Sequence, residues 1–308
     1  MWDINQKTIS GTLAFSGIGL HSGKKVTINL KPAEVDQGVV FCRTDLSDNN
    51  KILANFKNVS SARLCTKIEN SSGASVSTIE HLMAAFYICG IDNILVEINA
   101  PEVPIMDGSS KDFVEGIRNC GLKKLNKNRK FLKIVKKINL KDNDRSISIE
   151  PRPSSFEVDF TLTYKNSIIS TQSNRINFQE KDLVNVYTSR TFCLYEDVQK
   201  IKSIGLAQGG SLENAIVVQG DKVLNKKGLR CKKEFVNHKI LDLAGDFMLA
   251  GMRVIGSVKC SHGGHELTNS FLKKVFSDNS NFIITENLAT TTNIRKIVSN
   301  QKRLAVNA

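Results

Sequence analysis

Two runs of alternating apolar and polar residues, far apart in the chain, constrain the fold most. The first covers residues 26–31 and the second covers residues 156–163. A period of two residues is typical of a strand with one buried and one exposed face. Because both halves combine such strands with a few helical segments, we predict an α+β fold with mainly antiparallel sheets.

Four segments have the apolar spacing of helices: residues 77–89, a segment starting near Ser110, residues 232–250 and residues 267–276. In the first of them, Ser77 and Glu80 have the spacing of a capping box, and Gly90 is expected to end the helix. Residues 214–224 are typical of a hairpin that turns at residues 219–222.

The length of 308 residues favours two domains. We expect an N-terminal α+β domain over residues 1–124, a C-terminal α+β domain over residues 125–288 and a polar tail over residues 289–308. The basic, asparagine-rich stretch 121–130 is the candidate linker.

The chain shows no signal peptide, and its longest apolar run is about half of the roughly 20 residues that a membrane-spanning helix needs. A soluble, cytoplasmic protein without a transmembrane segment is expected. The seven cysteines are odd in number and form no CxxC pair, so we expect small buried thiols in a reducing compartment.

The net charge of +13 raises the hypothesis of nucleic-acid binding. The lysines are scattered, however, and few aromatic residues lie among them. We therefore expect no nucleic-acid partner, because attraction to a phosphate-bearing small molecule explains the charge equally well.

One polar stripe stands out in the apolar segment 232–250. His238, Asp242 and Asp246 are four residues apart, so they line one face of the expected helix, and their neighbours are apolar. Buried carboxylates need a cation or hydrogen-bond partners. A histidine and an aspartate one turn apart can hold Zn²⁺. Taken alone, an ordinary His–Asp ion pair explains the stripe better.

A second motif places Glu80 directly before His81 at the start of an apolar helix. Zinc peptidases use an adjacent His and Glu as a metal ligand and a base. Each residue has a simpler explanation, since Glu80 can cap the helix and His81 can be a core histidine. Together with His238 and Asp242, they predict a catalytic metal site with an open position for water.

The glycine-rich loop at residues 261–269 carries two further histidines. Such loops bring side chains close to a ligand. A histidine there could protonate a leaving amine, as amide hydrolysis requires. From spacing alone, His265 and His262 both remain candidates.

These motifs together resemble the UDP-3-O-acyl-N-acetylglucosamine deacetylases, the zinc-dependent enzymes of lipid A biosynthesis. The resemblance covers nearly the whole chain in order. Its matching stretches are residues 17–23, 77–85, 90–93, 104–109, 189–192, 209–211, 214–218, 223–225, 228–230, 238–246 and 264–265.

The resemblance implies a role for each matching residue. His81, His238 and Asp242 would bind zinc, Glu80 would activate water, and His265, paired with Asp246, would be the general acid. Thr191 would hydrogen-bond the oxyanion, whereas Lys239, Phe192 and His21 would contact the substrate. The list of residues implied is therefore catalytic Glu80, His265, Thr191 and Asp246; substrate-binding Lys239, Phe192 and His21; and metal-binding His81, His238 and Asp242.

The family's fold has two similar α+β domains whose helices lie between two sheets. Its reaction is the hydrolysis of the N-acetyl group of UDP-3-O-(3-hydroxyacyl)-N-acetylglucosamine, with release of acetate. The resemblance thus implies a UDP-acyl-amino-sugar as the substrate, Zn²⁺ as the cofactor with Fe²⁺ as the alternative, and a monomer. Tyr195, His262 and Glu266 depart from the family pattern near the acyl passage and the acid loop.

Two rival functions remain. A zinc peptidase or another amidase would use the same metal chemistry, and a peptide panel tested beside the acylated nucleotide sugar separates these enzymes. A non-catalytic basic binding protein would instead show nucleic-acid affinity that falls steeply with salt.

Overall fold

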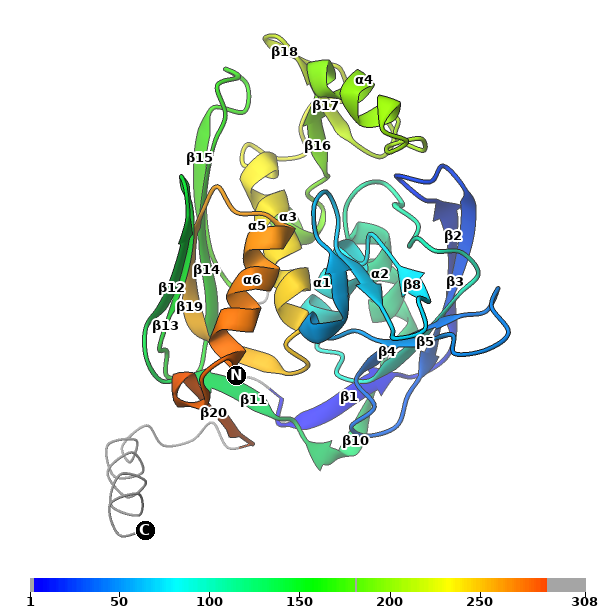
Figure 1. Cartoon of the computed structure of the whole chain (residues 1–308), viewed down its shortest axis with the longest axis vertical. Coiled ribbons are helices and arrows are strands. Elements are labelled where there is room, and N and C mark those ends of the chain that lie inside the picture. The colour runs from blue at the N-terminus through cyan, green and yellow to red at the C-terminus, as the bar shows by residue number, and fades with distance from the viewer. Residues whose placement is uncertain (1–2, 181, 287–308) are drawn as a thin grey trace.

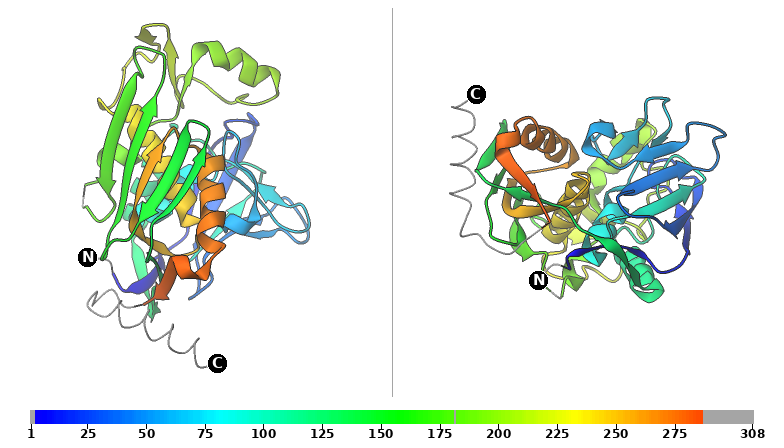
Figure 2. Two further views of the ribbon diagram at one scale, coloured as in Figure 1. Left: turned by 60° about the vertical axis from the view of Figure 1, so that its left-hand side comes forward. Right: turned by 90° about the horizontal axis from the view of Figure 1, so that it is seen from below.

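Helices lie between two sheets in the computed structural model, which describes residues 3–180 and 182–286 (Figure 1). The expected α+β class is confirmed, and so is the layered arrangement. The two sheets form the outer layers, one built from the first half of the chain and the other from the second, and helices from both halves fill the middle (Figure 2).

The sheet of the first half has five strands in the order β2-β3-β9-β4-β5. All neighbours are antiparallel except β4 and β9. The strands are β2 (Leu13–Ile18), β3 (Lys25–Pro32), β4 (Val39–Arg43), β5 (Lys51–Leu53) and β9 (Ile94–Ile98). The predicted strand over residues 26–31 is β3, and its apolar residues Val26, Ile28 and Leu30 are buried.

The sheet of the second half has seven strands. Five follow the order β12-β13-β19-β11-β20, and β14 joins β19 and carries β15 at the edge. The strands are β11 (Phe131–Ile134), β12 (Ile138–Asp142), β13 (Arg145–Glu150), β14 (Phe156–Thr163), β15 (Thr171–Asn177), β19 (Arg253–Ser261) and β20 (Phe282–Thr285). The predicted alternating strand over residues 156–163 is β14, with its apolar side chains buried.

Smaller sheets complete the fold: β1 (Asn5–Ile9) with β10 (Leu122–Asn128); β6 (Val59–Ser61), β7 (Lys67–Glu69) and β8 (Ser75–Val76); and β16 (Phe192–Leu194), β17 (Ile216–Gln219) and β18 (Lys222–Val223). The predicted hairpin over residues 214–224 is confirmed by the antiparallel pair of β17 and β18.

The linker prediction for residues 121–130 is wrong. Most of this stretch is β10, which pairs with β1 across more than a hundred residues of chain. Arg129, which directly follows β10, is buried and forms an ion pair with Asp92 (2.7 Å). A basic composition therefore marks an exposed strand face here rather than a connector. The predicted tail over residues 289–308 lies outside the described residues.

The helices are α1 (Glu80–Cys89), α2 (Lys111–Cys120), α3 (Val184–Tyr187), α4 (Tyr195–Ser203), α5 (Glu234–Met248) and α6 (His265–Phe276), with short 3₁₀ turns η1 (Phe56–Asn58) and η2 (Asn279–Asn281). Four of them, α1, α2, α5 and α6, confirm the predicted helices. The sequence did not indicate α3 and α4, which are short and pack few apolar residues.

The start of α1 differs from the prediction. Glu80 is the first residue of the helix, and the N-cap residue Ile79 makes no side-chain cap bond. Ser77 donates its hydroxyl to the carbonyl of Pro101 instead (3.2 Å). The capping box is therefore absent, and the carboxylate of Glu80 can bond to groups outside its own helix. Gly90 ends the helix in the left-handed conformation, as predicted.

Helices α1 and α5 pack closely because a glycine lies where they meet. A β-carbon at Gly245 would lie 2.1 Å from the carbonyl oxygen of Glu80. Only a residue without a side chain permits this approach. The contact brings the first turn of α1 beside the polar stripe of α5.

The cysteine prediction is confirmed in part. All seven thiols are free, and six are only half-buried, whereas Cys260 is buried. The expectation of buried thiols is therefore wrong for six of them. Within the described residues, no helix is long and apolar enough to cross a bilayer.

Candidate metal centre and active site

Three side chains from both halves of the chain converge at the contact between α1 and α5. The Nε2 atom of His81 lies 3.5 Å from Oδ1 of Asp242, and Nε2 of His238 lies 3.4 Å from the same oxygen. The three ligand atoms lie within 4.8 Å of one another, and all three residues are buried. The predicted triad is thus assembled around one point.

The residues of this triad fit a divalent cation. Oδ1 of Asp242 is buried and has no hydrogen-bond partner among the described residues. An unpaired buried carboxylate oxygen is costly, so a cation there would compensate it. Two imidazoles and one carboxylate, with space left for water, are typical of catalytic zinc sites.

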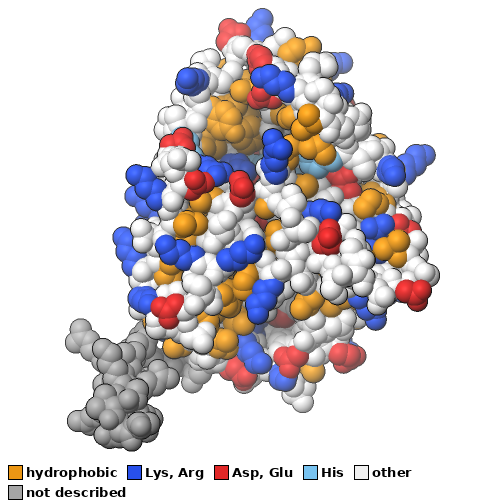
Figure 3. Space-filling view, in the orientation of Figure 1, with side chains coloured by type: hydrophobic (Ala, Val, Ile, Leu, Met, Phe, Trp, Pro, Cys, Tyr) orange, Lys and Arg blue, Asp and Glu red, His pale blue; other side chains and the backbone are white. Residues whose placement is uncertain are grey.

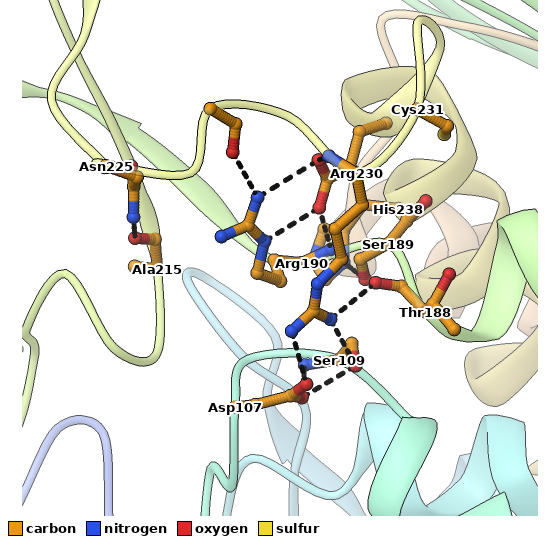
Figure 4. A network of polar contacts seen from close by, with 12 residues as sticks. Asp107, Ser109, Thr188, Ser189, Arg190, Ala215, Asn225, Arg230, Cys231 and His238 are labelled. Carbon is orange, nitrogen blue, oxygen red and sulfur yellow. Dashed lines mark hydrogen bonds and ion pairs between the residues drawn. The ribbon is translucent and has the colours of Figure 1, made fainter.

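A hydrogen bond behind the site fixes the orientation of His238. Its Nδ1 donates to the carbonyl of Ser189 (3.1 Å), so the lone pair of Nε2 faces the triad. The next residue, Arg190, forms a buried ion pair with Glu234 (2.8 Å) at the start of α5 (Figure 4). These contacts connect the loop before β16 to the helix that carries two of the three ligands.

The protonation states also suit metal binding. Burial lowers the pKa of His238 to about 3, so its imidazole is neutral. Burial alone would raise the pKa of Asp242, but the ammonium of Lys239 beside it holds it well below its usual range. A neutral imidazole and an ionised carboxylate are the forms that bind a metal. Oδ2 of Asp242 accepts a hydrogen bond from Nζ of Lys239 (2.8 Å).

Glu80 lies beside the triad with one carboxylate oxygen bonded and the other facing a histidine. Oε2 accepts the backbone N–H of Thr66 (3.0 Å), and Oε1 lies 3.8 Å from Nε2 of His265. Burial raises the pKa of the Glu80 carboxyl, which makes the group a better proton acceptor than an exposed glutamate.

His265 is held in its protonated form by its neighbours. Its Nδ1 lies 2.8 Å from Oδ2 of Asp246. Burial alone would lower the pKa of His265, but the charges of Asp246 and Glu80 raise it to about 9. The other candidate acid, His262, donates its backbone N–H to Thr161 and is absent from the described lining of the cavity. The geometry therefore favours His265.

A polar cavity of about 150 Å³ opens over these groups. The predicted residues Thr191, Phe192, Lys239 and His21 line it together with the triad, Glu80 and His265. Thr191 is fixed by its backbone, because its N–H donates to Gly108 (2.7 Å) and its carbonyl accepts from Ile216 (2.8 Å). Asp246 lies behind His265 and is absent from the lining.

Sequence reasoning missed Tyr164, Leu64 and Thr78, which also line the cavity. Tyr164 directly follows the recognised strand β14, so its position at a strand end was the one available signal. Thr78 lies within the matching stretch 77–85 but was given no role there, whereas Leu64 belongs to a loop without a distinctive pattern, and only the folded chain brings it to the site.

A larger apolar cavity of about 360 Å³ adjoins the polar one. Both are lined by Leu20, His21, Leu64, Thr191 and Phe192. The larger cavity extends under α4 and the sheet of β16–β18, where Val198, Ile201, Leu212, Val217 and Leu224 line it. Hydrophobic side chains gather in a hollow at this end of the molecule (Figure 3).

His21 lies where the two cavities meet. Its Nδ1 accepts the backbone N–H of Ala207 (3.4 Å), so the proton of the neutral ring is on Nε2. This Nε2 is buried and has no hydrogen-bond partner among the described residues. Burial lowers the pKa of His21 and keeps the ring neutral. The ring therefore offers one donor to a molecule that occupies both cavities.

Comparison with known proteins gives one consistent result. The family model described as "LpxC: UDP-3-O-acyl N-acetylglycosamine deacetylase" matches residues 6–277. A UDP-3-O-acyl-N-acetylglucosamine deacetylase of Geotalea uraniireducens is 45% identical over 273 residues, which cover 88% of each chain.

Two further relatives carry the same name. The protein of Actinobacillus succinogenes is 40% identical, and that of Aliivibrio fischeri is 37% identical. Each alignment spans 278 residues and covers 89% of this chain and 91% of the relative.

Proposed function

The chain belongs to the family of UDP-3-O-acyl-N-acetylglucosamine deacetylases, and from this membership we propose how its own residues perform the reaction. It is a hydrolase that cleaves the C–N bond of an acetamide on an acylated UDP-sugar, a step of lipid A biosynthesis. One observation carries the proposed mechanism: the proposed acid His265 and base Glu80 lie 3.8 Å apart in the cavity that His81, His238 and Asp242 also line.

We propose that His81, His238 and Asp242 hold Zn²⁺, with Fe²⁺ as the alternative. The two imidazoles and one carboxylate suit either ion, and the unpartnered Oδ1 of Asp242 supports a cation at this point. A divalent ion there would supply Lewis acidity toward water and toward the acetamide carbonyl.

Glu80 is the proposed general base. Because Oε2 accepts the N–H of Thr66, Oε1 is left to take a proton from the attacking water. The raised pKa of the buried carboxyl favours this transfer near neutral pH.

His265 is the proposed general acid. It is protonated before the reaction because Asp246 and Glu80 raise its pKa to about 9. As the tetrahedral carbon loses its nitrogen, Nε2 of His265 gives its proton to the leaving amine, and acetate is released. Asp246 positions the ring through Nδ1 and stabilises the imidazolium.

Thr191 is proposed to donate its hydroxyl to the developing oxyanion. Its backbone is held by bonds to Gly108 and Ile216, so the hydroxyl needs little rearrangement.

We propose that the substrate occupies both cavities. The acetamide would lie in the polar cavity, where Lys239 and Phe192 contact the sugar, and the acyl chain would enter the apolar cavity. His21, with its free Nε2–H, would bond the substrate at the junction. The 3-hydroxyacyl group, the monomeric state, the cytoplasmic location and the domain division after residue 124 stay predictions. That division falls within β10.

The deciding experiment combines metal analysis with an activity assay. Protein purified without chelator should contain about one divalent ion per chain and deacetylate UDP-acyl-GlcNAc but no peptide of a test panel. Glu80→Ala and His265→Ala should each lower turnover by about 10²–10⁴-fold with metal content unchanged. His238→Ala should lower both metal content and turnover.

His262→Ala is the matched control and should keep near-wild-type turnover. Near-full activity in Glu80→Ala or His265→Ala would remove that residue from the mechanism. An unchanged metal content in His238→Ala would contradict its role as a ligand.

A further inference from the structure

Thr66 belongs to none of the motifs described above. It hydrogen-bonds both the proposed base Glu80 and Asp246, the partner of the proposed acid His265. It lies just before β7, on the loop that carries Leu64 into the lining of the cavity, and it is 2% exposed. Its carbonyl also accepts the N–H of Ile79, the residue before α1 (3.4 Å). Thr66 is thus fixed against the start of the helix that carries Glu80.

Each of the two carboxylates divides its oxygens between Thr66 and His265. For Glu80, Oε2 accepts the N–H of Thr66 (3.0 Å) and Oε1 faces Nε2 of His265 (3.8 Å). For Asp246, Oδ1 accepts the hydroxyl of Thr66 (2.7 Å) and Oδ2 faces Nδ1 of His265 (2.8 Å). The four residues form a closed ring.

The hydroxyl of Thr66 has a specific effect in this ring. Asp246 lies on α5 and His265 starts α6, so neither helix by itself fixes the rotation of the Asp246 carboxylate. A bond from Thr66 to Oδ1 leaves Oδ2 pointing at the imidazole. The bond is short and charge-assisted, which is the stronger class of hydrogen bond.

We propose that Thr66 is a positioning residue of the reaction: its hydroxyl orients Asp246, and through Asp246 it orients the general acid His265, while its N–H orients the general base Glu80. This inference rests on the proposed function, because it assigns no chemistry to Thr66 itself. It predicts that the hydroxyl matters for turnover and hardly at all for substrate affinity.

The test compares variants that differ at this hydroxyl. Thr66→Val keeps the shape and the N–H and removes the hydroxyl, and it should lower kcat by about 10- to 100-fold with KM and metal content nearly unchanged. Thr66→Ser should restore most of the lost kcat. If Thr66→Val folds poorly, Thr66→Ala and Thr66→Ser form a second pair that also differs by one hydroxyl.

A double-mutant cycle tests the route of the effect. In an Asp246→Asn background, Thr66→Val should cost much less than it costs alone, because its partner is already altered. Wild-type kcat in Thr66→Val, an equal loss in the Ser and Ala variants, or full additivity with Asp246→Asn would each overturn the inference. Glu80→Ala and metal analysis on the same preparations show separately whether the proposed mechanism holds.

Discussion

At the residue scale, the site keeps two buried imidazoles in opposite protonation states. His238 has a pKa of about 3, and His265 has a pKa of about 9. Burial lowers both values, so the difference comes from their neighbours. His238 faces a second histidine and a lysine besides Asp242, whereas His265 faces the carboxylates of Asp246, Glu80 and Asp242. The first imidazole can bind a metal, and the second can donate a proton.

The first prediction concerns Asp246→Asn. Loss of the carboxylate removes the largest influence that raises the pKa of His265, so the acid should lose its proton at lower pH. Activity that needs protonated His265 is present below its pKa and is lost as pH rises through it. The basic limb of the kcat/KM profile should therefore move from about 9 toward neutral pH, as measured by rates from pH 6 to 10.

Asp278→Asn serves as the control for this prediction, because that carboxylate is exposed and pairs with Lys136 away from the site. It should leave the pH profile unchanged. A basic limb that does not move in Asp246→Asn would show that another group, and not His265, sets it.

Two pairs of the proposed site follow from residue type and spacing, because His238 and Asp242 share a helix face and Glu80 and His81 are neighbours. The choice of His265 over His262 and the roles of Thr191, Lys239, Phe192 and His21 rested on the family resemblance instead. Thr66 could not be found in this way. Its partners are 14 and 180 residues away, and only the folded chain brings them together.

At the element scale, the arrangement of the proposed catalytic groups depends on how closely α1 approaches α5. Gly245 faces the carbonyl of Glu80, and no β-carbon fits between them. The residue that permits this contact lies between the proposed ligand Asp242 and Asp246, the proposed positioning residue. Packing between the two helices and geometry at the site are therefore linked.

The second prediction is that Gly245→Ala separates the two helices. Relief of the 2.1 Å contact requires a backbone shift, which should lower the free energy of unfolding by about 1–3 kcal/mol. The same shift should weaken metal binding, because His81 moves relative to His238. Urea denaturation and metal titration measure the two effects. Gly11→Ala, whose β-carbon would meet only Cys120 Sγ at 3.8 Å, should change neither quantity.

The other end of α1 is held by a buried arginine of the second half. Arg253, at the start of β19, donates to the carbonyls of Phe86, Tyr87 and Ile91, and its guanidinium lies 4.3 Å from the ring centre of Tyr87. The carbonyls of Phe86 and Tyr87 also accept the N–H groups of Gly90 and Ile91, so Arg253 adds a charged second donor where the helix ends.

The third prediction is that Arg253→Met lowers the free energy of unfolding by about 3 kcal/mol or more, because it removes three buried hydrogen bonds from a charged donor and the contact with the ring of Tyr87. Guanidinium denaturation followed by circular dichroism measures this loss. Arg175→Met serves as the control, because Arg175 is an exposed arginine that pairs with Glu157. It should leave the denaturation midpoint nearly unchanged. Equal effects of the two substitutions would contradict the role given to Arg253.

The sequence predicted the four main helices and the two alternating strands because each has a clear period. It failed at the start of α1 and between the two halves. Ser77 and Glu80 have capping-box spacing, yet Glu80 is bonded to Thr66, since a tertiary contact competes successfully with the local cap. Residues 121–130 look like a linker because an exposed strand in a small sheet needs few apolar residues.

At the scale of the whole molecule, the site belongs to neither half alone. His81 comes from the first half, and His238 and Asp242 come from the second. A bound ion would therefore add a link between the two halves to the packing of α1 against α5.

The fourth prediction follows for removal of the metal. Chelation should lower the midpoint of thermal unfolding, and added Zn²⁺ should restore it. Free ion at 100 times its dissociation constant would stabilise the folded state by about 2.7 kcal/mol. Scanning calorimetry with and without chelator measures the shift. His238→Ala should be insensitive to chelator, and a similar shift in that variant would place the ion elsewhere.

The adjacency of Glu80 and His81 has a mechanical consequence. Consecutive residues on one helical turn move as a rigid unit, so motion of one half against the other carries the proposed base Glu80 and the proposed ligand His81 together. His265 belongs to the second half, as do His238 and Asp242. Such motion would therefore change the distances from this pair to the acid and to the other two ligands at the same time, so both the attack of water and the protonation of the amine depend on a rigid contact between the halves.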